Sequence, residues 1–409
     1  MAQKISEGKI CENLCRKFLK KIGKNFVWNF CEKISEKFEK KFWIFFGEEI
    51  RKNWKSFGRG PKNRKNLENF GKNVGEIERD FGVFAVGVWD CGGVFPPYIR
   101  ALRRRKVGKK IRESAATGEK SKIFTELHAH KSGTPNLAGG MLLLVMAVML
   151  GLGEIVQSLG WITNSLVNRE ETYVLLFAFF SMGALGLLDD WLNVKGRGAV
   201  KGLSARAKLL GMFVIAGFVS RWFWAKLGMT TLNLWPIAGT IELGRGMMIF
   251  SFLLLVSVVN AINITDGLDG LAGGLMAIVL GVLAVLTFAA QTFIATTVLA
   301  IVISSLLAFL WFNINPAKIF MGDGGALGLG GLLTVLVLLL NLRGIGIFVP
   351  FVVLFGIFVV DTLSSGLQIF WKKVFKKKLF VVAPLHHLLE KRGVPETHIV
   401  MKARLIQGV

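Results

Sequence analysis

Long apolar runs dominate the chain from about residue 137 onward. About 20 apolar residues suffice for a helix to cross the roughly 30 Å hydrocarbon layer of a bilayer. The runs do not alternate between apolar and polar positions, and Leu, Val, Gly and Ala are their main residues, which favours helices over a barrel. The pattern predicts an all-α, polytopic integral membrane bundle with eight spans, at 137–159, 172–188, 209–225, 246–263, 271–290, 293–312, 324–341 and 347–371.

The part of the chain before these runs has a different pattern. A ninth apolar segment at about 81–98 is short and contains Asp90, so it is a poor span. Residues 1–80 are rich in Lys, Asn, Glu and Phe and lack the apolar core and cleavage site of a signal peptide. Weak order, a surface-lying amphipathic helix or a mis-set start codon would each account for them. We therefore expect an atypical, poorly ordered basic segment at 1–80 and a membrane domain at 81–409.

Composition agrees with the membrane assignment, and the charge distribution predicts an orientation. The chain is 52% hydrophobic with a mean hydropathy of +0.51, which excludes an ordinary soluble domain. Its formal net charge of +24 is concentrated in loops at 100–131, 195–208 and 372–378. Basic loops remain in the cytoplasm, and counting spans from the first loop places all three there. We attribute this charge to topology and anionic lipid rather than nucleic acid, because no nucleic-acid-binding module accompanies it.

Four polar clusters lie at the ends of the apolar runs. They are Asp189-Asp190 and the segments 260–270, 313–323 and 383–390. Ionisable groups beside a membrane span are costly and usually functional. The same counting of spans places all four clusters on the cytoplasmic side, so the sequence predicts one site on that face.

Carboxylates and lysines in these clusters suggest phosphate chemistry. Asp189 and Asp190 are adjacent and repel each other unless a cation offsets their charge. Mg²⁺ prefers such oxygen ligands and commonly takes phosphate oxygens as well. A helix end merely decorated with acids is the plain alternative, but Lys208 and its basic segment 201–208 follow closely. Together the acids and cations favour phosphoryl transfer, with a lipid as one substrate because the site lies at a membrane surface.

The other clusters carry less specific signals. Asp266 and Asp269 share a face if their segment is helical, and Gly267 permits close approach of a ligand. Phe320, read alone, is more typical of a core residue than of a ligand-stacking one. Adjacent histidines on a helix point about 100° apart. A metal site held by both residues of the 386–387 pair is therefore a poorer fit than phosphate binding or proton transfer.

Several motifs resemble one enzyme superfamily. The stretch 260–272 (Asn-Ala-Ile-Asn-Ile-Thr-Asp-Gly-Leu-Asp-Gly-Leu-Ala), the stretch 320–325 (Phe-Met-Gly-Asp-Gly-Gly), and Asp-Asp followed by Lys-Gly-Leu-Ser-Ala-Arg resemble the polyprenyl-phosphate N-acetylhexosamine-1-phosphate transferases, glycosyltransferase family 4. Stretches 106–113, 131–140 and 383–396 look most like the phospho-N-acetylmuramoyl-pentapeptide transferases, the lipid I synthases, within it. The resemblance covers about residue 96 to the C-terminus.

The resemblance implies a specific reaction. Phospho-MurNAc-pentapeptide would pass from UDP-MurNAc-pentapeptide to undecaprenyl phosphate, giving lipid I and UMP for peptidoglycan. It also implies an Mg²⁺ cofactor, contact with membrane lipid, a homodimer, and a multi-pass position in the bacterial cytoplasmic membrane with a cytoplasmic active site.

The resemblance further implies roles for individual residues. Asp189, Asp190 and Asp323 would be catalytic, with Asp323 and Asp190 at the metal. The nucleoside pocket would comprise Lys131, Asn313, Phe320, Gly267, Leu268 and Asp269, and the polar positions around the diphosphate and sugar would be Lys208, Asn260, Asp266, Gln368, His386 and His387.

The chain also departs from the family pattern. Leu388 stands where a third histidine is usual, Asn136 where Thr is common, and Ala326 where Ser is usual. Of the ten expected helices the first is poor, and the chain ends at Val409, where we expect a last helix to begin. Three alternatives therefore stay open: a GlcNAc-1-phosphate transferase, favoured by Leu388; a transporter, which would carry acids at mid-helix between repeated halves; and an inactive, truncated relative.

Overall fold

The computed structural model describes residues 91–105, 107–108, 131, 133–160, 167, 169–196, 202–234, 238–290, 292–346 and 348–408. These residues all belong to the second of two units into which the chain divides, Asp80–Val409. The expectations for residues 1–80, and for the first part of the 81–98 segment, lie outside the described residues.

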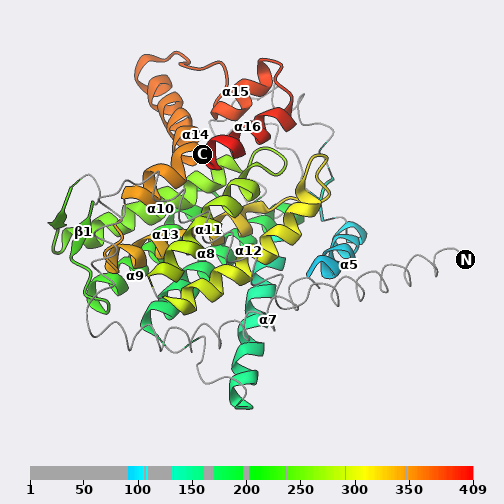
Figure 1. Cartoon of the computed structure of the whole chain (residues 1–409). Helices are drawn as coiled ribbons and strands as arrows, with labels where there is room; N and C mark the ends of the chain where they lie inside the picture. The colour runs from blue at the N-terminus through cyan, green and yellow to red at the C-terminus, as the bar shows by residue number, and fades with distance from the viewer. Residues whose placement is uncertain are drawn as a thin grey trace, which may run out of the picture. The chain divides into compact units, whose positions relative to one another are not determined.

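The second unit is a bundle of helices (Figure 1). Seven of its described helices, α7 to α13, are long and apolar enough to cross a membrane, and α14 occupies the eighth predicted run. These helices confirm the prediction of an all-α membrane bundle. The helices are α5 (Cys91–Arg104), α7 (Ala138–Ser158), α8 (Glu170–Lys195), α9 (Ala205–Ala225), α10 (Gly246–Thr265), α11 (Leu271–Ala289), α12 (Phe293–Asn313), α13 (Gly322–Leu342), α14 (Phe348–Phe375), α15 (Leu385–Lys391) and α16 (Glu396–Gly408).

Two helix ends correct details of the sequence prediction. α8 continues beyond its apolar run to Lys195, where Gly196 ends it in a left-handed conformation (φ 64°). Asp189 and Asp190 therefore lie inside the helix, not at its end. α10 ends at Thr265 and α11 begins at Leu271, so Asp266 and Asp269 lie in a turn and do not share a helical face.

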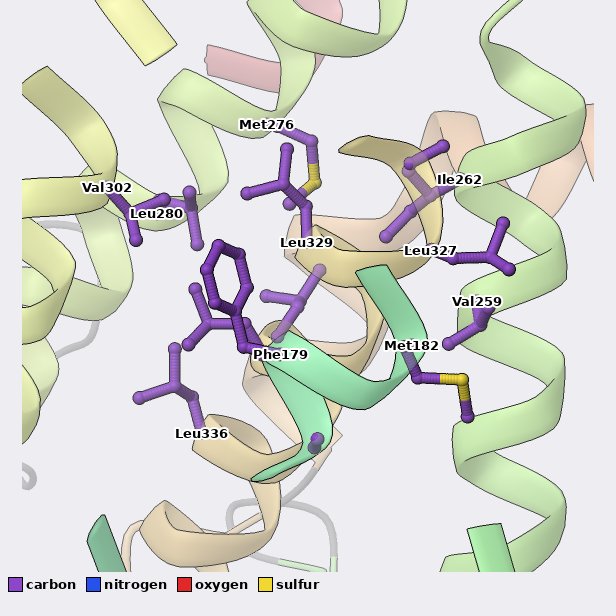
Figure 2. Close-up of a cluster of buried hydrophobic side chains, with 14 of the residues drawn as sticks. Phe179, Met182, Val259, Ile262, Met276, Leu280, Val302, Leu327, Leu329 and Leu336 are labelled. Carbon is purple, nitrogen blue, oxygen red and sulfur yellow. The ribbon is translucent and has the colours of Figure 1, made fainter. Parts of the chain in front are cut away.

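α13 is the central helix of the bundle. Nearly all of its residues are buried, and it packs against α7, α8, α10 and α11. Its leucines interdigitate with apolar side chains from the surrounding helices. Figure 2 shows this core, in which Leu327, Leu329 and Leu336 of α13 meet Phe179 and Met182 of α8, Val259 and Ile262 of α10, Met276 and Leu280 of α11, and Val302 of α12.

Glycines let α13 approach its neighbours closely. A Cβ added at Gly186 of α8 would collide with the backbone of Asp323 and Gly324, and one at Gly139 of α7 would collide with Gly325. Small residues are the usual means of close packing between membrane helices. These contacts bring the first turn of α13 against the polar end of α8, which sets the position of Asp323.

The outer surface of the spans is apolar, as lipid contact requires. Val214 of α9 is 67% exposed, Ile249 of α10 is 62% exposed and Trp311 of α12 is 79% exposed. At the opposite end of α13 lies an antiparallel hairpin, β1 (Thr231–Asn233) and β2 (Thr240–Glu242). The side-chain amide of Asn341 donates to the carbonyl of Thr231 at 2.9 Å and ties this hairpin to the bundle.

Candidate active site

The four polar clusters predicted to meet do so at one end of the bundle. Consecutive spans run in opposite directions, so the last turns of α8, α10 and α12 lie beside the first turns of α9, α11 and α13. Direct contacts connect them. The amide of Gly324 donates to Asp190 Oδ2 at 3.0 Å, and the amide of Gly270 donates to Asn313 Oδ1 at 2.9 Å.

Three aspartates and one lysine form what we call the carboxylate cluster: Asp189, Asp190, Asp323 and Lys208. Lys208 Nζ lies 3.3 Å from Asp189 Oδ2 and also pairs with Asp323 Oδ2. Leu203 donates its backbone N–H to Asp189 Oδ1 at 2.7 Å. Asp189 and Asp190 are buried, whereas the Asp323 side chain is 27% exposed. With all three acids ionised, one lysine leaves the cluster with two excess negative charges.

Asp190 is fixed by groups from two other elements. The side-chain amide of Asn136 donates to its Oδ1 at 3.0 Å, and the first turn of α13 supplies the Gly324 amide. The N-terminus of a helix favours an anion at this position. Asn136, a departure from the family pattern, is therefore a direct partner of the cluster. Tyr98 of α5 donates to the Leu137 carbonyl at 2.8 Å, and burial together with the charge of Asp190 raises the pKa of Tyr98 to about 12.

The carboxylate cluster fits a magnesium ion that arrives with phosphate. Within the described part of the chain, no three Asp, Glu, His or Cys side chains form a ready set of metal ligands. Lys208 already lies between Asp189 and Asp323. Mg²⁺ commonly binds one or two carboxylates and completes its shell with water and substrate phosphates. The oxygen donors and the excess negative charge suit that mode of binding rather than a closed protein cage.

The segment from Asp266 to Gly270, here the 266–270 turn, is held by buried ion pairs. Asp269 Oδ1 lies 2.8 Å from Lys131 Nζ, and its Oδ2 accepts from the Ala317 amide at 3.0 Å. Lys131 Nζ is also 2.6 Å from Glu396 Oε1. Asn313, at the end of α12, bonds both the Gly270 amide and the Ile319 carbonyl. The turn, the loop after α12 and the start of α16 are therefore joined.

Phe320 lies along the chain between the loop after α12 and the carboxylate cluster. Its amide donates to the Pro135 carbonyl at 2.8 Å, and its carbonyl accepts from Ala138 at 3.2 Å. These bonds fix the backbone only three residues before Asp323. The Phe320 side chain is half-buried, unlike the fully buried core residues of the bundle.

The histidine pair, His386 and His387, lies in the first turn of the short helix α15, which contacts the middle of α14. Figure 1 shows α15 after the long loop that follows α14. The ring centroids are 4.2 Å apart, and both Nε2 atoms face Gly267, where a Cβ would collide with them. The expectation that adjacent histidine rings diverge is wrong here. The side chains are held by acids, with His386 Nδ1 at 2.7 Å from Asp361 Oδ2 and His387 Nδ1 at 3.0 Å from Glu390 Oε2.

Asn260 and Gln368 bond backbone groups of their own helix and of the following loop. The Asn260 amide donates to Val256 of its own helix at 2.8 Å. The Gln368 amide bonds the backbone of Leu379 and Phe380 and so fixes the loop after α14. Leu268 is buried in the 266–270 turn, and Asp266 is half-buried there. Their roles toward substrate stay predictions.

The structure adds three residues that sequence reasoning missed. Asp361 holds His386, Glu396 holds Lys131, and Arg404 Nη2 donates to the Gly270 carbonyl at 2.6 Å. Asp361 did carry a signal, since a lone acid inside an apolar run is unusual. Glu396 and Arg404 lie in an ordinary amphipathic segment, and no pattern distinguishes them from surface charges.

The fold and this site define a polytopic membrane protein with acids, lysines and histidines gathered at one end of its spans. The sequence model described as glycosyl transferase family 4 matches residues 172–341, from α8 to α13. Phospho-N-acetylmuramoyl-pentapeptide-transferases are similar over much more of the chain. That of Geobacillus sp. (strain WCH70) is 36% identical over 315 residues, and that of Bacillus subtilis (strain 168) is 34% identical over 306 residues. Each alignment covers 75% of this chain and 87% of the relative. The chain belongs to the phospho-N-acetylmuramoyl-pentapeptide-transferase family.

Proposed function

We propose that this chain transfers phospho-MurNAc-pentapeptide from UDP-MurNAc-pentapeptide to undecaprenyl phosphate. The products are lipid I and UMP, and the reaction belongs to peptidoglycan biosynthesis. The observation that carries the proposal is the 34–36% identity to transferases of that name over 87% of their length. The cluster of acids and lysines at one end of a membrane bundle supports the same chemistry.

Neutralisation of the substrates' phosphate charge by Lys208 and Mg²⁺ would lower the barrier to phosphoryl transfer. An oxygen of the lipid phosphate attacks the β-phosphorus of the nucleotide sugar, the new P–O bond forms, and the bond from that phosphorus to the bridging oxygen breaks as UMP leaves. Lys208 is placed to neutralise phosphate charge. Asp323 and Asp190 would hold Mg²⁺, which supplies further neutralisation of the diphosphate.

The second part of the site would bind the nucleoside. Phe320 is half-buried and would stack on uracil, while the 266–270 turn, Lys131 and Asn313 would frame the pocket. The histidine pair lies against the same turn and would contact the diphosphate or sugar. In this arrangement Asp269 orients the turn through its bonds to protein groups.

We further propose that the chain lies in the bacterial cytoplasmic membrane and that the end of the bundle with the candidate active site, the site end, faces the cytoplasm. The basic segments beside α8 and α14 support this orientation, because basic loops remain inside. UDP-linked donors are cytoplasmic metabolites of high charge, so this side also gives the soluble substrate direct access.

UMP release tests the proposal. Membranes containing this chain receive undecaprenyl phosphate and Mg²⁺, with UDP-MurNAc-pentapeptide or UDP-GlcNAc in parallel, and EDTA in a third arm. We expect release with the first donor only, lost with EDTA. Release with UDP-GlcNAc only would show that the chain is a GlcNAc-1-phosphate transferase, the alternative that Leu388 favours. If folded protein released no UMP with either donor, the result would contradict the proposed activity.

A further inference from the structure

Asp361 of α14 bonds His386 at the start of α15. Its carboxylate is buried in α14, with Oδ2 at 2.7 Å from His386 Nδ1 and Oδ1 at 3.4 Å from the His386 backbone nitrogen. One turn further along α14, Ser364 Oγ accepts from the Leu385 amide at 3.1 Å. Two side chains on one face of α14 thus hold α15, but only Asp361 contacts the imidazole.

This contact assigns the proton on the ring. An ionised carboxylate can only accept hydrogen bonds, so Nδ1 of His386 must carry the hydrogen that it donates. In the neutral ring Nε2 then has a lone pair, and in the imidazolium it has a proton to donate. Either way, Asp361 leaves Nε2 as the ring atom that is available to a ligand.

Nε2 of His386 lacks the partner that its burial demands. His386 is only 3% exposed, and among the described residues no hydrogen-bond partner lies at its Nε2. The atom faces Gly267 in the 266–270 turn. Buried polar atoms in native proteins are rarely unpaired, and the exceptions gather at functional sites. A bound substrate at this turn would supply the missing partner.

We propose that Asp361 is a positioning residue of the transferase reaction. It fixes both the orientation and the tautomer of His386, so that Nε2 is presented to the substrate bound against the 266–270 turn. The proposal rests on the proposed function for the identity of that substrate. It differs from a purely structural role, in which Asp361 and Ser364 would only anchor α15.

The tautomer can be measured without any activity. Asp361→Leu removes both carboxylate oxygens and leaves Nδ1 of His386 without an acceptor, whereas the oxygen of an asparagine amide could still accept from Nδ1–H. Without that acceptor, the ring takes its intrinsically preferred neutral tautomer, with hydrogen on Nε2. We expect ¹⁵N-histidine NMR at a pH where the ring is neutral to show an unprotonated Nε2 in the wild type and a protonated one in Asp361→Leu. The resonance is assigned by its loss in His386→Gln. An unchanged tautomer would overturn the proposal.

Kinetics provide the second test, with a matched control. We expect Asp361→Leu to lower kcat/KM by about 10- to 100-fold, by analogy with the loss of a group that orients a metal-binding histidine. Ser364→Ala removes the other tie to α15 and should cost much less. In the His386→Gln background, Asp361→Leu should cause no further loss, because Asp361 acts through that ring. Equal losses from Asp361→Leu and Ser364→Ala, or full additivity with His386→Gln, would show a structural role.

A conservative variant distinguishes misfolding from the loss of the carboxylate. Asp361→Glu retains the carboxylate, so it should keep the Nδ1–H tautomer and more activity than Asp361→Leu; a tautomer change in Asp361→Glu would count against the assignment. If the wild-type chain released no UMP, the proposed function would fail, but the NMR comparison would still decide whether Asp361 sets the tautomer.

Discussion

At the residue scale, the site is defined by an imbalance of charge in a small space. Lys208 is shared by Asp189 and Asp323, while Asp190 is held by neutral donors. Asp323 is the most exposed of the three carboxylates and stands at the first turn of the central helix. It is therefore the acid best placed to hold the Mg²⁺ ion that we propose.

Replacing Asp323 with Asn should abolish turnover while the protein remains folded. The amide keeps the size of the side chain but loses the negative charge that would bind Mg²⁺, and we expect kcat to fall by about 100-fold or more. UMP release measures activity, and thermal unfolding in detergent checks the fold. Near-wild-type rates at millimolar Mg²⁺ would rule out this role.

Phe320→Ala distinguishes a stacking residue from a core residue. Stacking of a base on an aromatic ring contributes about 1–3 kcal/mol. We expect the KM for the nucleotide sugar to rise accordingly, with kcat little changed and unfolding temperature nearly preserved. An unchanged KM with a clear loss of stability would instead show that Phe320 belongs to the core.

At the element scale, the last described helix, α16, holds the 266–270 turn, where we propose that the nucleoside binds. Glu396, at the first turn of α16, accepts from the Asp269 amide at 2.6 Å and from the Asn315 side chain at 3.2 Å. Arg404, two turns later, donates to Gly270, and burial lowers the pKa of this arginine. Residues far apart in sequence thus fix one turn between α10 and α11.

Glu396→Gln should weaken nucleotide binding more than it slows the chemical step. Glutamine can still accept from Asp269, but it loses the charge paired with Lys131, which is then left with Asp269 alone. We expect a KM for the nucleotide sugar several-fold higher at similar kcat. Lys402→Gln, on the exposed side of α16, is the control for a change of charge and should behave as wild type. Equal KM values in the two variants would exclude this role for Glu396.

The sequence predicted the spans well because hydrophobic length is a local property. The run 271–290 became α11 (Leu271–Ala289), and 293–312 became α12 (Phe293–Asn313). Contacts between elements that are distant in sequence are not a local property. The spacing of residues along the chain therefore did not predict the bond between Glu396 and the 266–270 turn, nor the close approach of the two histidine rings. The rings meet because Asp361 and Glu390 fix their torsions, which helical geometry alone does not determine.

At the scale of the whole molecule, the two ends of the bundle differ in chemistry. One end gathers the carboxylate cluster, the 266–270 turn and the histidine pair. The other carries the β1–β2 hairpin and an exposed ion pair between Arg343 and Glu171 at 2.8 Å. A membrane would therefore separate the polar site from the hairpin, whichever side each faces.

Cysteine labelling tests the orientation of these ends. In a variant without the native cysteines, Lys195→Cys marks the site end and Glu242→Cys marks the hairpin; both positions are exposed. A membrane-impermeant maleimide should label Glu242→Cys in intact cells and Lys195→Cys only after permeabilisation. The reverse pattern would place the site outside and contradict the proposed orientation.

The burial of α13 has a consequence for biogenesis. Chains are synthesised from the N-terminus, so α7 to α12 are made before the helix around which α7, α8, α10 and α11 pack. Until Gly322–Leu342 emerges, Gly139 and Gly186 lack the α13 backbone against which they pack in the finished bundle. Asp323 can pair with Lys208 only once that helix is in place. Completion of the carboxylate cluster is therefore coupled to completion of the bundle, and earlier assembly intermediates lack the Lys208–Asp323 pair.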